Sequence, residues 1–376
     1  MNVAEQIVAQ LVDAGVHRIY GIVGDSLNPI VDAVRKTGGS AQGGIDWIHV
    51  RHEEAAAFAA SAEAQLTGKL AVCAGSCGPG NLHLINGLYD ANRTGAPVLA
   101  IASHIPSVQI GSTYFQETHP DRVFEECSVY NELISSAAQS PRTVNSAIRH
   151  AVGLGGVAVI TLPGDITDLK AVEHVPTYAP ARPATLTPNP ADIDEAAALL
   201  NKADKVAIFA GAGVEGAHDE VIALADALKA PIGHSLRGKH FIQYDNPFDV
   251  GMTGLLGYGA AAEGMNDADV LILLGTDFPY DQFLPDTPTI QVDTHAEKLG
   301  RRTDVGLAIH AQVKPFIEAL LPHLRAGRSD SFLKSKIKKH SEIMHAPVGA
   351  YTRNVEKMRP IHPEYAAHLL NETAAK

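Results

Sequence analysis

The chain has 376 residues, more than one ordinary hydrophobic core organises, and this length indicates two or three domains. A hydrophobic fraction of 45% with 33 glycines and 22 prolines is typical of a globular α/β protein and excludes a disordered or fibrous chain. The net charge of −12 argues against nucleic-acid binding. The first residues lack the features of a signal peptide, and no apolar run approaches the ~20 residues of a membrane span. We therefore expect a cytoplasmic protein.

Residues that commonly form disulfides or bind metals do not cluster along the chain. Cys73, Cys77 and Cys127 provide neither a disulfide framework nor the paired CxxC spacing of a zinc site, and we predict that they are buried core residues. The 18 histidines are scattered, and no HExxH motif occurs. We therefore predict no metal ligands among the side chains of this chain.

The first part of the chain alternates between helical and strand patterns. Apolar residues recur at helical spacing from Ala4 to Val12, and Gly15 ends that helix. Short apolar runs, separated by further helical patterns, predict strands at 17–23, 45–51, 70–74, 97–102 and 157–162. Continuous apolar runs bounded by glycine and proline are typical of a parallel sheet covered on both faces. Residues 1–170 are therefore predicted to form one doubly wound domain.

The stretch from Trp47 to Ala60 leads an apolar strand into two carboxylates and then into an alanine-rich helix. Glu53 lies where the strand ends, at the edge of a parallel sheet where α/β proteins bind ligands. A carboxylate beside the apolar residues that follow it suits proton exchange. The alternative is that Glu53 and Glu54 only occupy the first helical turn, where negative charge offsets the macrodipole.

A glycine-rich loop runs from Ala74 to Asn81, after a predicted strand and at the start of a helix. Its backbone N–H groups and the helix N-terminus can approach a ligand without intervening side chains. A tight structural turn is the alternative, although such turns ordinarily use one or two glycines and this loop has three and a proline.

Proline and threonine dominate residues 171–190, which we predict to be a proline-stiffened linker. After it the alternation of strands and helices resumes, with strands predicted at 206–210, 231–234, 270–274 and 289–292. Residues 191–325 are therefore predicted to form a second doubly wound domain. Residues 326–360 begin with a basic stretch and are predicted to be a connector on the protein surface.

The second domain contains two further glycine loops. Residues 211–216 fit the GxGxxG pattern of dinucleotide-binding proteins, but the acidic residue expected about 20 positions later is missing. Residues 274–279 again lead from a strand into glycine. Asp293, at the end of a strand, either accepts a hydrogen bond from a ribose hydroxyl or only caps the next turn.

Seven segments together resemble the thiamine diphosphate enzymes of the pyruvate oxidase group, and most closely the bacterial quinone-dependent pyruvate dehydrogenases. They are 21–28, 50–55, 71–83, 114–120, 236–239, 250–256 and 275–280. The resemblance covers nearly the whole chain and implies a pyrimidine-binding domain at 1–170 and a Rossmann-like FAD domain at 191–325. The glycine loop at 211–216, which fits an NAD site only in part, then belongs to a flavin site.

The resemblance also implies a reaction and a set of site residues. Pyruvate loses CO₂ on thiamine diphosphate with Mg²⁺, FAD takes two electrons from the adduct and passes them to a quinone or other acceptor, and hydrolysis then releases acetate. The residue matching Glu53 hydrogen-bonds the aminopyrimidine ring of thiamine. The implied catalytic residues are Glu53, Phe115 and Gln116. The implied thiamine contacts are Gly24, Asp25, Gly78, Pro79, Gly80 and Asn81. The implied FAD contacts are Gly211, Gly213, Arg237, Thr253, Gly254, Leu255, Leu256, Gly275, Thr276, Asp277, Phe278, Pro279 and Asp293.

One departure from the family concerns the third domain, which binds the cofactor's diphosphate through Mg²⁺ and carries a GDG run. No GDG occurs here, and residues 361–376 resemble only the opening of that domain. We therefore expect a truncated chain, without the C-terminal region through which the family makes its peripheral membrane contact. The family's active sites lie between subunits, so a homo-oligomer, either a dimer or a tetramer, is expected.

The resemblance leaves three alternatives open. The reaction could be that of an acetolactate synthase or of an oxygen-using pyruvate oxidase, or the chain could be a non-catalytic FAD-binding module.

Because the expected diphosphate domain is missing, we predict that the purified chain alone does not turn over pyruvate. The assay supplies pyruvate, Mg²⁺, thiamine diphosphate and an artificial electron acceptor. Reduction of the acceptor above the rate without protein would refute the prediction.

Overall fold

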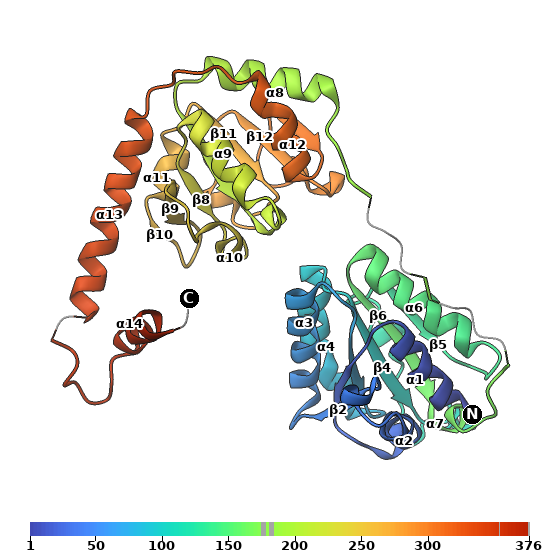
Figure 1. The fold of residues 1–376 in the computed structure, drawn as a ribbon. Helices are drawn as coiled ribbons and strands as arrows, with labels where there is room; N and C mark the ends of the chain where they lie inside the picture. The colour runs from blue at the N-terminus through green and yellow to red at the C-terminus, as the bar shows by residue number, and fades with distance from the viewer. Residues whose placement is uncertain (174–177, 180–183, 353, 375–376) are drawn as a thin grey trace. The chain divides into compact units, whose positions relative to one another are not determined.

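The computed structural model describes residues 1–173, 178–179, 184–352 and 354–374. The chain divides into two compact units, Met1–Arg182 and Pro183–Lys376, each built around one sheet (Figure 1). Part of the predicted linker at 171–190 lies outside the described residues. No helix in the described ranges is long and apolar enough to cross a membrane.

The sheet of the first unit has six parallel strands in the order β2-β1-β3-β4-β6-β5. The strands are β1 (Arg18–Gly21), β2 (Asp46–His49), β3 (Ala71–Gly75), β4 (Val98–His104), β5 (Tyr130–Leu133) and β6 (Val157–Pro163). Every residue of β3, β4 and β6 is buried, as their continuous apolar runs indicate. The predicted strands are confirmed, and only the edge strand β5 was missed.

Helices cover both faces of this sheet (Figure 1). One face carries α1 (Val3–Asp13), α2 (Asn28–Lys36) and α6 (Ser140–Leu154), and the other carries α3 (Glu53–Thr67), α4 (Pro79–Thr94) and the short α5 (Pro120–Val123). The short α7 (Gly164–Thr167) follows β6. A capping box between Asn2 and Glu5 begins α1, while Pro79 at the start of α4 and Gly95 at its end delimit that helix.

The approach of α3 to α4 is unusually close because small residues line the contact. Ala57 and Ala60 of α3 are fully buried, and a Cβ added to Gly87 of α4 would lie 2.5 Å from the Cβ of Ala57. Such a distance cannot be accommodated without separating the helices. Gly87 is therefore required by packing and not by backbone conformation.

The sheet of the second unit has seven strands in the order β10-β9-β8-β7-β11-β12-β13, parallel except for the antiparallel β10. The strands are β7 (Val206–Ala210), β8 (Ile232–His234), β9 (Asp249–Met252), β10 (Tyr258–Gly259), β11 (Val270–Leu274), β12 (Thr289–Asp293) and β13 (Leu307–His310). The four predicted strands are confirmed, and β9, β10 and β13 were missed. The predicted fold class, two doubly wound α/β domains, is confirmed.

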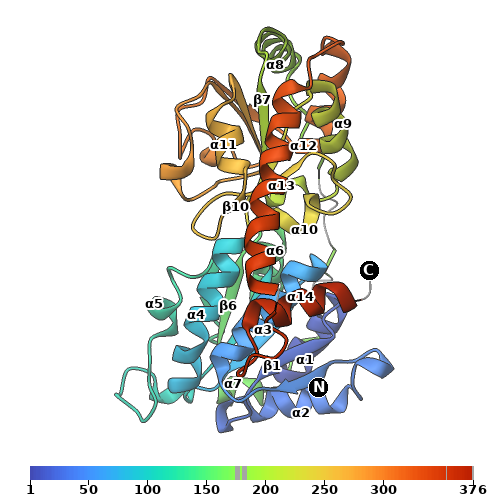
Figure 2. The same ribbon diagram turned by 90° about the vertical axis from the view of Figure 1, so that its left-hand side faces the viewer.

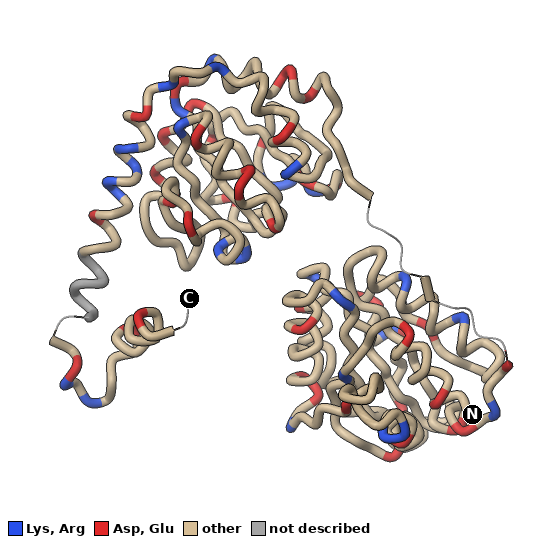
Figure 3. Tube along the Cα trace, viewed as in Figure 1, with Lys and Arg blue, Asp and Glu red and all other residues tan. Residues whose placement is uncertain are grey.

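One face of the second sheet is covered by α8 (Pro190–Lys202), α9 (His218–Leu228) and α12 (Val313–Leu320), and the other by α11 (Ala261–Asn266) (Figure 1). The long α13 (Ser331–Thr352) packs against α11 and against β9 and β10 at the edge of the sheet (Figures 1 and 2). The short α10 (Lys239–Ile242) follows β8, and α14 (Pro363–Thr373) is the last helix. Basic residues recur along the first half of α13 (Figure 3). Among them, buried Lys336 hydrogen-bonds Glu263 at 2.7 Å and also binds Asp267. Much of the predicted connector is thus a helix docked on this unit.

Two helical glycines allow a matched test of the α3–α4 packing. Gly87→Ala should destabilise the protein by about 1–3 kcal/mol through overpacking, whereas Gly153→Ala in α6, with open space around its Cβ position, should be neutral or stabilising by up to about 1 kcal/mol. Urea denaturation followed by circular dichroism measures both. Equal effects of the two substitutions would contradict the packing assignment.

Candidate functional site

The candidate thiamine site lies at the carboxyl edge of the first sheet, at its topological switch point. From β1 the chain proceeds to β2 on one side, while from β3 it proceeds to β4 and β6 on the other. The loops that leave β1 and β3 therefore diverge and open a crevice between them, which is where open α/β sheets bind ligands. Gly24 and Asp25 follow β1, Glu53 follows β2, and residues 76–81 follow β3.

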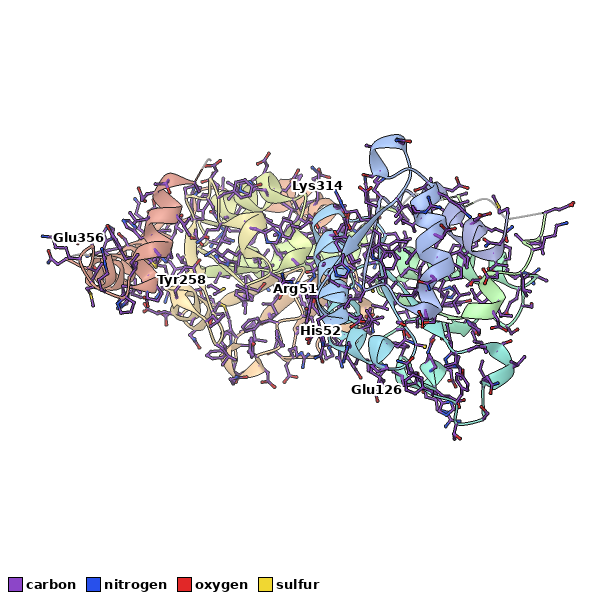
Figure 4. All side chains as sticks on the ribbon, turned by 90° about the horizontal axis from the view of Figure 1, so that it is seen from below. Arg51, His52, Glu126, Tyr258, Lys314 and Glu356 are labelled. Atoms are coloured by element: carbon purple, nitrogen blue, oxygen red, sulfur yellow. The ribbon has the colours of Figure 1, made fainter. Side chains whose placement is uncertain are left out.

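Glu53 is the first residue of α3, and His52 precedes it as the N-cap, accepting a hydrogen bond from Glu54 N at 3.3 Å (Figure 4). Glu53 is only 8% exposed. Its Oε2 lies 3.0 Å from Nδ1 of His83, and its Oε1 lies 3.1 Å from the position that a Cβ on Gly80 would take. A negative charge in the first turn offsets the helix macrodipole without being buried, so the macrodipole alone does not explain why Glu53 is buried.

The glycine loop has a backbone that only glycine adopts readily. Gly78 has φ +72° and ψ −118°, and a Cβ there would lie 2.8 Å from Cβ of Gln116. Gln116 itself has φ +65°, and its Oε1 accepts a hydrogen bond from Cys77 Sγ at 3.5 Å. The structure therefore brings Gln116 onto the predicted thiamine loop. Phe115, in contrast, is 78% exposed.

A partly buried hydroxyl network joins the loops after β1 and β3 to the end of β4. Ser26 Oγ lies 3.0 Å from Ser76 Oγ and 2.6 Å from Ser103 Oγ, and it accepts from Cys77 N at 3.0 Å. Asn81 Nδ2 donates to Ser103 O at 2.7 Å. Asn81, predicted as a cofactor contact, thus holds the glycine loop against β4. Asp25, after β1, and Pro79, in the glycine loop, are exposed.

The candidate flavin site lies at the switch point of the second sheet, between β7 and β11. Its two glycine loops pack directly on each other. Gly213 N donates to Gly275 O at 2.9 Å, and a Cβ on Gly213 would lie 2.6 Å from Gly275 Cα. A Cβ on Gly211 would likewise collide with Thr276. Packing between the loops therefore explains these glycines without a cofactor.

Other predicted flavin contacts divide between buried and exposed positions. Thr253, Thr276 and Asp293 are buried, and Asp293 Oδ1 accepts from His295 N at 2.9 Å, which matches the turn-capping alternative. Buried Phe278 packs edge-on against Phe209 at 5.0 Å, and Pro279 follows it. Leu255 and Leu256, beside Gly254 in the turn between β9 and β10, are 68% and 71% exposed. These two leucines form an apolar surface at the edge of the site.

Positive charge lies beside the same loops. Asp277 is paired with Arg301 and with Arg302, whose Nε lies 3.3 Å from Asp277 Oδ1. A cavity of about 350 Å³ borders the segment that contains Arg237 and is lined by Leu236, Lys239, His240, Gln243 and Tyr244. A larger cavity, about 600 Å³, lies near the start of α13 and includes none of the predicted site residues.

The residues fit an aminopyrimidine more specifically than they fit a flavin. The Glu53 carboxylate is buried, and Gly80 has no side chain to cover its Oε1. Such a carboxylate suits a ring whose nitrogens form hydrogen bonds. The flavin fit rests on the exposed leucines and neighbouring arginines. Within the part of the chain that the structure describes, no three His, Cys, Asp or Glu side chains have a metal-binding arrangement. The three cysteines are buried, as predicted, and burial raises the pKa of Cys73 to about 12 and that of Cys127 to about 11.

Several residues at the two candidate sites could not be predicted from the sequence. His83 and His52 meet only because α3 packs on α4, their rings stacking at 4.2 Å. Ser26 and Ser76 lie inside segments that carried the resemblance, although no pattern predicted that they would pair. Arg301 and Arg302 belong to the loop between β12 and β13, where no sequence motif indicates a site.

Comparisons with known proteins assign both units to one enzyme family. Residues 1–123 match the thiamine pyrophosphate enzyme N-terminal TPP binding domain, and residues 193–320 match the thiamine pyrophosphate enzyme central domain. An uncharacterised 42.6 kDa protein of Pseudomonas amyloderamosa is 54% identical over 335 residues, which are 88% of this chain and 83% of that protein.

Two longer relatives carry names that mention chemistry. A provisionally named thiamine pyrophosphate-containing protein of Bacillus subtilis, YdaP, is 36% identical over 99% of this chain and 64% of its own length. A pyruvate oxidase of Lactiplantibacillus plantarum is 32% identical over 86% of this chain and 54% of its own length. The chain thus spans between half and two thirds of these two relatives, and it belongs to the thiamine pyrophosphate enzyme family, of which it contains the N-terminal and central domains.

Proposed function

We propose that this chain supplies the pyrimidine-binding and flavin-binding parts of an enzyme that oxidatively decarboxylates pyruvate to acetate and CO₂ and passes electrons through FAD to a quinone. The observation that carries the proposal is the buried Glu53 carboxylate, whose Oε1 faces Gly80 at the switch point. Pyruvate, the acceptor, thiamine diphosphate with Mg²⁺, and assembly as a homo-oligomer are parts of the same proposal.

Each residue of the first site has a distinct role in the proposal. Glu53 Oε1 binds the aminopyrimidine ring and holds a proton there. Gly78 and Gly80 let the backbone approach the ring, and Gln116, held by Cys77, faces the substrate. When bound, thiamine diphosphate supplies the nucleophile and the electron sink for decarboxylation.

In the second site, the apolar surface of Leu255 and Leu256 supports the flavin ring system. Arg301 and Arg302 supply positive charge near the flavin's diphosphate. A second candidate keeps pyruvate and flavin but changes the acceptor to oxygen, because a named relative is a pyruvate oxidase. Comparing acceptor reduction with and without oxygen separates the two.

Glu53→Gln should abolish decarboxylation in an enzyme with a complete cofactor site, because the neutral amide cannot hold the proton. We expect a loss of about 100-fold or more in pyruvate-dependent acceptor reduction, with flavin still bound. Glu54→Gln, in the same helical turn, is the matched control, since Glu54 bonds Asn86 instead. Unchanged turnover in Glu53→Gln would remove this residue from the mechanism.

The purified chain should take up FAD and show its visible absorption band after gel filtration. Replacing Leu255 and Leu256 together by lysine should reduce the bound flavin at least about 10-fold, because the apolar support is lost and both positions are too exposed to affect folding. Leu66→Lys, at an 86% exposed position in the first unit, is the control. A colourless wild-type protein would count against the flavin site, and equal flavin in the double variant would count against the leucines.

A further inference from the structure

We propose that His83 is a positioning residue for Glu53: its Nδ1–H donates to Oε2 and so leaves Oε1 as the oxygen that meets the aminopyrimidine ring. This inference rests on the proposed function and deepens it. The distance of 3.0 Å between Nδ1 and Oε2 is that of a hydrogen bond, and Oε2 has no hydrogen to donate when Glu53 is ionised. Nδ1 must then carry the proton.

The two oxygens of Glu53 are in different surroundings. Oε2 is held by His83, whereas Oε1 lies against the open side of Gly80, 3.1 Å from where a Cβ would stand. Among the residues that the structure describes, Oε1 has no hydrogen-bond donor. The bond to His83 fixes the plane of the carboxylate and so keeps its second oxygen against Gly80.

The His83 ring is itself fixed from a second direction. It stacks on His52 with ring centroids 4.2 Å apart and an interplanar angle of 27°. His52 is held in turn, because its Nδ1 accepts the N-cap hydrogen bond from Glu54 N at 3.3 Å. The ring of His83 therefore lies between a stacking partner and the carboxylate that it orients, although its own side chain is 43% exposed.

The hydrogen bond between His83 and Glu53 is also the first of a series of interactions between α3 and α4. Asn86 Nδ2 donates to Glu54 Oε1 at 2.7 Å, Gly87 packs on Ala57, and Ser61 Oγ donates to Asp90 Oδ2 at 2.7 Å. These interactions recur about once per helical turn along α3 and α4, and together they fix the rotation of α4 about its axis. His83 reaches Glu53 because the whole series is in register.

Two substitutions separate the hydrogen bond from the stacking. His83→Phe keeps a ring to stack on His52 but removes the donor, whereas His83→Asn loses the ring but places an amide N–H close to the position of Nδ1. We expect calorimetric titration with thiamine to show at least about 10-fold weaker binding for His83→Phe and within about 3-fold of wild type for His83→Asn. His17→Phe, at an exposed position in the same unit, is the control, and circular dichroism melts verify folding.

Nitrogen-15 NMR of the histidine rings tests the bond itself in the protein without cofactor. Nδ1 of His83 should carry a proton in the wild type and lose this preference in Glu53→Leu. An unprotonated Nδ1 in the wild type, or equal thiamine affinity in His83→Phe, would overturn the inference. If wild-type protein binds no thiamine, the proposed function fails, and the NMR measurement still decides whether His83 holds Glu53.

Discussion

The close approach of α3 and α4 is the constraint on which the candidate thiamine site depends. Alanines on α3 and the glycine at position 87 of α4 remove the side-chain volume that normally separates two helices. The two N-termini then meet at the carboxyl edge of the sheet, where α3 begins with Glu53 and α4 begins with the glycine loop. The packing of α4, whose Gly87 lies more than 30 residues after Glu53 in the sequence, thus determines which groups surround the Glu53 carboxylate.

Glycines serve different purposes in the two units. In the first, Gly80 leaves space against Glu53, and Gly78 takes a backbone conformation that other residues avoid. In the second, Gly213 and Gly275 are needed because two loops touch. A pattern such as GxGxxG therefore predicts close backbone approach but does not say whether a ligand or another loop makes it. The exposed leucines at 255 and 256 are better evidence for a bound apolar ring.

Most inner strands could be predicted from the sequence because they are buried on both faces, as in β7 and β11, whose predicted and observed bounds coincide. Of the edge strands, β2 was predicted but β5, β10 and β13 were not, and the inner strand β9 was missed as well. In β5, Asn131 and Glu132 interrupt the apolar pattern, and in β13 buried and exposed residues alternate. Strands at a sheet edge have one partner and lose the continuous apolar signal.

The same distinction applies to the candidate site. Glu53 and the glycine loops were predictable because they follow strands, and strand ends carry a local signal. His83 was not, because its partner is 30 positions away and only the register of two helices joins them. The resemblance to a known family indicated which cofactors to expect, whereas only the structure showed which residues contact Glu53.

A crystal structure of this protein grown with thiamine diphosphate and Mg²⁺ would test the role of Glu53 most directly. We predict that a nitrogen of the aminopyrimidine ring lies within hydrogen-bond distance of Glu53 Oε1, with the ring against Gly80 and His83 still bound to Oε2. A pyrimidine ring bound elsewhere, with Glu53 turned away from it, would contradict the central claim.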